Sequence, residues 1–319
     1  MTPRNTARLA QALILAAFVG LAVLLATTTA EHLAQRGIRS GFDFLLEPAG
    51  FALGESLLAF EPEDTTLRAF AAGLANTLRV ALPGVALALA VGILTGFARM
   101  GDNPLVRGLA SAAIDAFRNV PLLLQLLAWY FILTDLLPAA DAALRLGPGV
   151  YLSKSGLALP WWGEQGFETP EIAGFGIEGG ARLTPEYLAM LLGLVLYSAA
   201  YIAETLRAAV EALPPGQRLA ALAMGMTPRQ AFLLVLLPQA WRAALPPVTS
   251  QLLNLFKNAS LAVAIGYPDL VSVAGTSLNQ TGRAIECLSI VIAVYLLLSL
   301  AAAALSHRLE ARSLRGAPR

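Results

Sequence analysis

The chain has 319 residues, of which 57% are hydrophobic and only 13% are charged, and its mean hydropathy is +0.65. This composition excludes an ordinary soluble domain, which does not need so much apolar surface. The formal net charge of +1 predicts no nucleic-acid partner, and the single cysteine, Cys287, cannot form an intrachain disulfide.

Six apolar runs are each about 20 residues long, the length that crosses a bilayer core. They lie at 9–29, 71–97, 109–133, 187–206, 243–265 and 284–306. The first could be the apolar core of a signal peptide, but it is longer than such a core and no clear cleavage site follows Thr29. We therefore predict an all-α, polytopic membrane protein with about six transmembrane helices in a lipid bilayer.

Two of these helices have clear start signals. Asn103-Pro104 precedes the third run, and Thr184-Pro185-Glu186 precedes the fourth. Asparagine and threonine are favoured N-caps, and proline is favoured at the first helical position. The long loop before the fourth helix is rich in glycine and proline and contains Trp161-Trp162. Such a pair is typical of a membrane-interface anchor, and a docking surface for an external protein is the alternative interpretation.

Basic residues outside the apolar runs gather on one side of this topology. They are Arg4, Arg8, Arg99, Arg107, Arg207, Arg218, Arg229, Arg242, Arg308, Arg312, Arg315 and Arg319. Fewer basic residues are spread over the longer loops of the other side. Because basic loops stay on the cytoplasmic side, we predict that both termini are cytoplasmic.

Residues 216–238 carry the most specific local pattern. A short helix is expected to end at Gly225, and a second helix is expected to begin with Thr227 as N-cap and Pro228 at its first position. Gln230 stands where a capping box places its glutamine. A capped helix-turn-helix in a loop of a membrane protein predicts a rigid surface presented to something outside the bilayer.

The sequence lacks the motifs of several enzyme classes. It contains no phosphate-binding loop of the form G-x-x-x-x-G-K-[ST] and no G-x-S-x-G motif, and its two histidines, His32 and His307, are far apart. We predict no catalytic residue, no metal site and no cofactor bound by this chain. If the protein does work against a gradient, the energy must enter through another polypeptide or through an ion gradient. Two functions that remain open for such a chain are an ion-coupled secondary transporter of small polar solutes and a membrane-embedded enzyme.

Residues 216–238 resemble the cytoplasmic Glu-Ala-Ala loop of permease subunits in binding-protein-dependent ABC importers. The residues in register are Ala220, Ala221, Gly225, Val235, Leu237 and Pro238. Asn76-Thr77-Leu78 and the segments 117–125, 257–261 and 279–282 resemble the polar amino acid branch of that family. The first helix and the loop at 138–184 resemble permeases of the general L-amino acid uptake type. Leu219 departs from the pattern, because the family has a glutamate there.

The resemblance implies the type I ABC importer permease fold and a division of the chain. It divides into an N-terminal helix and periplasmic segment at 1–70, a permease domain at 71–307 with a periplasmic insert at 138–184 and a coupling loop at 211–238, and a cytoplasmic tail at 308–319. The residues expected to couple to the ATPase are Gly216, Gln217, Ala220, Ala221, Gly225 and Pro238.

The resemblance also implies that the chain lies in the inner (cytoplasmic) membrane and that it has three protein partners. They are a separate ATP-binding subunit that holds ATP and Mg²⁺, a second permease that forms a heterodimer with this chain, and a periplasmic amino-acid-binding protein.

Polar groups inside apolar runs are costly and usually face a cavity or a partner. The tentative substrate path consists of Lys257, Asn258, Glu286, Gln125 and Arg118. Lys257 needs an acidic or carbonyl partner if it is buried. Glu286 could be that partner, or could instead meet the amino group of a substrate.

Two further charged pairs are interpreted structurally. Asp115 and Arg118 are three residues apart, so we favour a mutual ion pair or a helix-end bond over substrate contact. Glu204 and Arg207 are expected at the cytoplasmic end, where they would brace the coupling loop.

Overall fold

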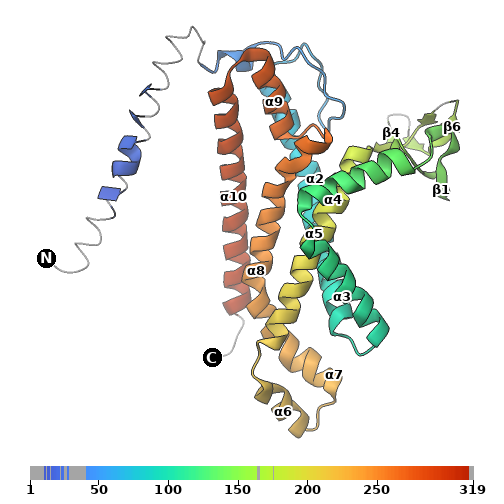
Figure 1. Cartoon of the computed structure of the whole chain (residues 1–319), viewed down its shortest axis with the longest axis vertical. Helices are drawn as coiled ribbons and strands as arrows, with labels where there is room; N and C mark the ends of the chain where they lie inside the picture. Colours follow the sequence, from blue (N-terminus) through green and yellow to red (C-terminus); the bar gives the residue numbers. More distant parts are fainter. Residues whose placement is uncertain are drawn as a thin grey trace.

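The computed structural model describes residues 41–163, 166–174 and 176–315, together with short separate stretches between 11 and 28. The first predicted helix, at 9–29, is described only in part, and its described residues are helical. Four long helices form the body of the protein (Figure 1). They are α2 (Thr66–Met100), α5 (Pro185–Glu211), α8 (Leu237–Asn258) and α10 (Ala284–Arg315).

Small residues bring α2 and α5 into close contact along their length. A Cβ atom at Gly92 would lie 2.8 Å from the Cβ of Ile202, and one at Gly96 would lie 3.3 Å from the Cα of Ala203. Small residues allow helix backbones in a membrane to approach in this way. Leu126 from α4 and Leu194 from α5 fill the same buried core.

In the described part of the chain, four helices are long and apolar enough to cross a membrane, or five if a bent pair counts as one span. The bent pair corrects the prediction of one continuous helix at 109–133. α3 (Pro104–Asn119) and α4 (Leu122–Phe131) meet at 106°. Pro121 causes the break, because it has no N–H to donate and forces Val120 into an extended conformation with φ −100° and ψ 129°.

A short helix not predicted from the sequence, α9 (Leu270–Thr281), lies between α8 and α10 in the chain and packs against α2. A Cβ at Gly73 of α2 would lie 3.0 Å from the carbonyl oxygen of Asp269. The 3-10 segment η5 (Ala259–Ile265) leads into α9, and Gly282 with φ 70° ends it. Too short to span a membrane, α9 closes one end of the bundle, here called the α9 end (Figure 1).

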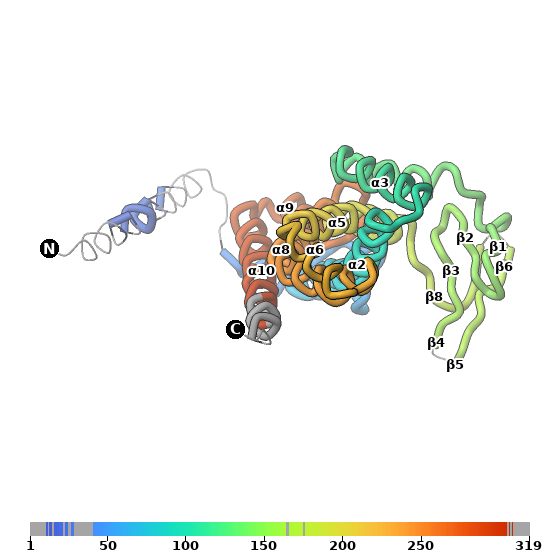
Figure 2. The backbone as a smooth tube through the Cα atoms, turned by 90° about the horizontal axis from the view of Figure 1, so that it is seen from below, coloured from blue at the N-terminus to red at the C-terminus, as the bar shows by residue number. Residues whose placement is uncertain are grey.

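Residues 138–184 fold into short strands and not into an irregular loop. Three small antiparallel sheets have the strand orders β1-β2-β3-β8, β4-β5 and β6-β7. The strands are β1 (Leu144–Gly147), β2 (Val150–Ser153), β3 (Gly156–Leu159), β4 (Trp161–Gly163), β5 (Gly166–Glu168), β6 (Glu171–Ala173), β7 (Gly176–Glu178) and β8 (Ala181–Leu183). This β insert stands to one side of the helices (Figure 2).

Other short elements connect the helices. The 3-10 helix η1 (Asp43–Leu46) belongs to the segment 41–65, which packs against α9 and α10 through Phe44 and Phe51. The π-helical segment η2 (Ile132–Leu136) and the 3-10 turn η3 (Ala140–Ala142) join α4 to the β insert. At the opposite end from α9, α6 (Pro215–Ala223), α7 (Pro228–Gln230) and the π-helical η4 (Ala231–Leu236) join α5 to α8.

Candidate functional site

The helix-turn-helix at residues 215–236 has the local structure that the sequence predicts. Gly225 follows α6 in the left-handed region, with φ 84°, which only glycine adopts without strain. The capping box is complete, because the Gln230 N–H donates to Thr227 Oγ1 at 3.3 Å and the Thr227 N–H donates to Gln230 Oε1 at 2.9 Å. These contacts lie within the loop, so they hold its shape without help from the rest of the chain.

The helix-turn-helix projects beyond the lower ends of the long helices (Figure 1). Of the six residues predicted to couple to the ATPase, only Ala221 is buried, where it packs the unit against the chain. The other five are exposed: Gly216, Gln217, Ala220, Gly225 and Pro238. The outward side chains Leu219 and Met224 are 66% and 81% exposed. The projecting surface therefore combines small residues and exposed apolar side chains with polar ones such as Gln217 and Arg218.

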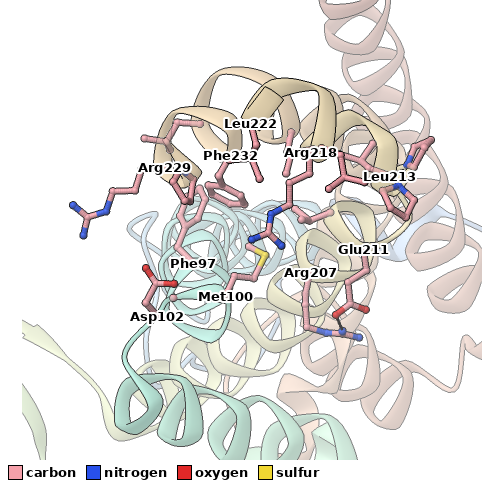
Figure 3. A pocket seen from close by; sticks show the side chains of 18 residues that line it. Phe97, Met100, Asp102, Arg207, Glu211, Leu213, Arg218, Leu222, Arg229 and Phe232 are labelled. Carbon is pink, nitrogen blue, oxygen red and sulfur yellow. Dashed lines mark hydrogen bonds and ion pairs between the residues drawn. The ribbon is translucent and has the colours of Figure 1, made fainter. Parts of the chain in front are cut away.

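A cavity of about 990 Å³ separates the helix-turn-helix from the ends of α2 and α5. Its walls are largely apolar and include Phe97, Met100 and Phe232. Arg218 extends from α6 into this space, whereas Arg229 points away from it (Figure 3). Neither arginine forms an ion pair with any described residue, so both are available to an acidic partner.

A network of ion pairs joins α2, α3 and α5 at the base of this cavity. Glu204 accepts from Arg207 at 2.6 Å and from Arg99 at 2.9 Å, and Arg118 lies 3.7 Å from it. Arg207 also lines the cavity beside the loop, whereas Glu204 does not; that this pair braces the loop stays a prediction. The predicted pair between Asp115 and Arg118 is wrong. Asp115 instead pairs with Arg99 at 3.3 Å, because α2 brings Arg99 between α3 and α5.

Two of the five residues predicted for the substrate path have structural partners near the bend between α3 and α4. Gln125 is buried, and its Nε2 donates to the carbonyl oxygens of Phe117 and Val120, each at 2.8 Å. It therefore satisfies carbonyls that the break at Pro121 leaves without helical partners. Arg118 lies over the ring of Tyr201 at 5.5 Å in addition to its contact with Glu204.

The suggested pairing of Lys257 with Glu286 is also wrong. Glu286 is buried near the start of α10, where its Oε1 accepts from the Gly41 N–H at 2.7 Å. Lys257 is exposed in the last turn of α8 and lines a groove that includes Tyr295. Nine residues of α10, or about 14 Å of helix, separate Glu286 from Tyr295. Asn258, next to Lys257, is half-buried where α8 ends.

A buried polar cluster at the α9 end could not be located from the sequence. Asn76 has no exposed surface, and its amide donates to the carbonyls of Glu55 and Pro268, each at 2.9 Å. Its Oδ1 accepts from the Leu57 N–H at 2.9 Å. The Glu55 carboxylate also contacts Arg79 and Thr184. The sequence singled out Asn76 as part of a family motif inside an apolar run, but neither signal identifies its partners in a loop about 20 residues away.

Asp269 caps α9 from a buried position. Its Oδ1 accepts from the Ser272 N–H at 2.8 Å, and Oδ2 has no partner among the described residues. Burial raises the pKa of Asp269 from its usual 3.8 to about 7, against the opposing effect of the backbone hydrogen bonds. No group of three or more potential metal ligands occurs in the part of the chain that the structure describes.

The chain is similar to membrane components of binding-protein-dependent transport systems. Residues 88–315 match the family described as binding-protein-dependent transport system inner membrane component. A putative amino-acid ABC transporter permease, YhdX of Escherichia coli, is 36% identical to this chain, and the alignment covers 93% of this chain and 91% of YhdX. The general L-amino acid transport system permease AapQ of Rhizobium johnstonii is 35% identical, with coverage of 91% and 88%.

Another relative and two solved structures extend the comparison. The glutamate/aspartate import permease GltJ of Escherichia coli is 33% identical over 71% of this chain and 80% of its own. A chain of an amino acid ABC transporter crystallised with histidines has a TM-score of 0.58 and 26% identity, with coverage of 77% of this chain and 94% of its own. A chain of the inward-facing MetNI methionine ABC transporter, at 19% identity and a TM-score of 0.54, shares the fold.

Proposed function

The chain belongs to the family of binding-protein-dependent transport inner membrane components, and it is a permease subunit of an amino-acid ABC importer with the type I fold. We propose that its helix-turn-helix couples it to a separate ATPase. The observation that carries this proposal is a small, capped, exposed surface that projects beyond the long helices. The chain itself is a transporter subunit, and ATP with Mg²⁺ is bound by the partner.

Several features support docking of an ATPase at this surface. Small residues at 216, 220 and 225 allow close approach, and the apolar side chains of Leu219 and Met224 are available for burial. Leu219 stands where the family has a glutamate, so the contact that a carboxylate would make is absent. Arg218, without an ion-pair partner in the described chain, offers a charge of opposite sign to an acidic group of the ATPase.

The ion-pair network gives a route from this surface to the long helices. A movement of α6 is transmitted to α5 and α2, because the ends of these two helices are held together by Arg207, Glu204 and Arg99. Since α2 and α5 also pack tightly at Gly92 and Gly96, a displacement at their ends moves both as a unit. Alternating access would follow from such movement in this chain and in a second permease.

We further propose the remaining partners and the orientation. A second, non-identical permease completes the path, and a periplasmic amino-acid-binding protein delivers the substrate at the α9 end. The helix-turn-helix and both termini lie in the cytoplasm; the arginines near this unit, Arg218, Arg229 and Arg242, support that orientation through the positive-inside rule.

Uptake by membrane vesicles that contain the complete system tests the function. We expect uptake of radiolabelled amino acids that stops when ATP is depleted and continues in the presence of a protonophore. Uptake that survives ATP depletion but is abolished by the protonophore would contradict the proposal in favour of an ion-coupled carrier. Affinity purification in mild detergent, with an ATPase and a second permease expected in stoichiometric amounts, tests the partners.

A further inference from the structure

An exposed aromatic hairpin lies at one edge of the β insert (Figure 2). It consists of strands β4 and β5 and is here called the β4–β5 hairpin. Its aromatic residues Trp161, Trp162 and Phe167 are 61%, 73% and 60% exposed. An exposed apolar patch of this kind marks a contact with a membrane, another protein or a ligand.

Aromatic side chains occupy both faces of the β4–β5 hairpin. Trp162 pairs with Phe167 across the strands, and their rings meet edge to face with centroids 5.5 Å apart. Trp161 points to the opposite face, because side chains alternate along a strand. Glu168, the partner of Trp161, accepts from the Gly180 N–H at 3.1 Å, so its carboxylate is held against the insert. Aromatic rings on both faces of so thin an element fit a medium that surrounds it, whereas a docked protein would cover one face.

The connections of the β insert place it at the surface of the bilayer. It follows the bent pair α3 and α4 through η2 and η3, and β8 leads directly into α5, an apolar span that begins at Pro185. The Lys154 N–H donates to the Pro138 carbonyl at 2.8 Å and so holds the insert close to the end of η2. The insert lies beside the helices, at about the level of α9 (Figure 1 and Figure 2). The hairpin is therefore near the depth at which lipid headgroups lie.

The composition of the hairpin indicates how it would meet lipid. Residues 161–168 contain two glutamates and no lysine or arginine, so their charge does not attract them to anionic headgroups. Tryptophan is enriched at the membrane–water interface because its amphipathic ring is stable at the level of the headgroups. A two-stranded hairpin alone is at best marginally stable in water, so this contact would also stabilise the strands.

We propose that the β4–β5 hairpin is inserted into the headgroup region of the bilayer at the α9 end, where its aromatic side chains anchor the β insert without electrostatic attraction. The anchor fixes the depth of the end of η2 and of the start of α5, the two elements that the insert joins. It does not depend on docking of an ATPase at the other end of the bundle, so it goes beyond the proposed function.

Photo-crosslinking of the complete complex in native membranes tests this contact directly. Trp162 is replaced by the photoreactive aromatic residue p-benzoylphenylalanine, and Ile292 and Leu297, exposed on different sides of the apolar span α10, are replaced in the same way as positive controls. We expect a phospholipid adduct at position 162. An adduct there with the second permease or with a soluble binding protein overturns the inference. So does the lack of any adduct at position 162 when a control position gives one with lipid.

Hydrogen exchange supplies a second measurement, made on the complex in nanodiscs of phosphatidylcholine. Trp161→Ser should raise exchange in β4 and β5 roughly fivefold, because an interfacial contact is lost while the contact between Trp162 and Phe167 remains. Ile172→Ser, at an exposed apolar position of the other hairpin, β6–β7, is the matched control and should leave this exchange unchanged.

The lipid composition separates an aromatic anchor from an electrostatic one. Added phosphatidylglycerol should not slow exchange in β4 and β5 of the wild type, because the hairpin has no basic residue. Equal exchange in the wild type and Trp161→Ser, or strong protection that appears only with phosphatidylglycerol, contradicts the proposed anchor. Neither measurement uses ATP-driven uptake, so these outcomes are independent of the proposed function.

Discussion

The two ends of the helix bundle are stabilised in different ways. At the α9 end, the buried polar residues Asn76, Arg283 and Glu286 connect the segment 41–65 to the long helices. The helix-turn-helix at the other end has one buried residue in α6, Ala221, and its stabilising contacts are local caps. One end is therefore completed within the chain, whereas the other presents a preformed surface with little tertiary support.

This difference has a physical consequence for stability. Buried hydrogen bonds are expensive to leave unsatisfied, so loss of one at the α9 end should reduce the global free energy of unfolding. A locally capped unit opens with a smaller free energy than the whole chain, so changes in it should leave global stability unaffected. The following substitutions test that contrast.

The largest expected effect is at Asn76. Asn76→Ala leaves the carbonyls of Glu55 and Pro268 and the Leu57 N–H without partners, which should cost roughly 3 to 4 kcal/mol of unfolding free energy. Denaturant titration of the purified complex in detergent measures this cost. Gln217→Ala, at the exposed end, is the control and should change stability by less than about 0.5 kcal/mol. Equal losses for the two variants would refute the contrast between the ends.

The next effect concerns pH. Since the pKa of Asp269 is raised to about 7 in the folded state, its burial destabilises the fold once the carboxyl ionises, and stability is lost as pH rises from about 4 through 7. Asp269→Asn keeps an equally good cap but has no charge. Between pH 5 and pH 8, the wild type should lose roughly 2 to 3 kcal/mol relative to this variant in denaturant titrations. Parallel pH profiles would show that Asp269 does not resist ionisation.

At the helix-turn-helix, Gly225→Val should reduce ATP-driven uptake about tenfold, because a β-branched residue is strained at φ 84° and the turn must change shape. Insertion into the membrane should be unaffected, and ATP hydrolysis should persist without transport. Gly108→Ala in α3 is the control, since a Cβ there meets nothing within 4 Å and the backbone is not in the left-handed region. Normal uptake by Gly225→Val would rule out a role for this turn in coupling.

The smallest effect compares two threonine caps of the same kind at opposite ends. Thr65→Ala removes the cap of α2 and should lower global stability by about 1 kcal/mol. Thr227→Ala should leave global stability unchanged and raise amide hydrogen exchange roughly fivefold around Gln230. Protection measured by mass spectrometry distinguishes local from global opening. A global loss from Thr227→Ala would show that the helix-turn-helix is integral to the core.

The sequence predicts those features that depend on neighbouring residues. Thr227, Pro228 and Gln230 specify a capping box within four positions, and Asn103 and Thr184 mark helix starts in the same way. Most of the spans follow from hydropathy alone. The match of the 216–238 pattern to a family then predicted the class of protein correctly.

Features that depend on distant contacts were predicted less well. The bend at Pro121 was hidden inside an apolar run, although proline there is a local warning. Ion-pair partners were wrong for Asp115 and Lys257, because spacing along one helix does not reveal which residue another helix brings near. The strands of the β insert have only three or four residues each, too few for an alternating pattern to be recognised.

Site-directed crosslinking in native membranes tests the central claim, that the helix-turn-helix is the docking surface of the ATPase. Met224→Cys and Leu46→Cys, 81% and 76% exposed in the wild type and at opposite ends, would each carry a short photo-crosslinker in a Cys287→Ala background. We predict that Met224→Cys forms an adduct with a protein that contains a G-x-x-x-x-G-K-[ST] loop and that Leu46→Cys does not. An ATPase adduct from Leu46→Cys, with none from Met224→Cys, would contradict the account.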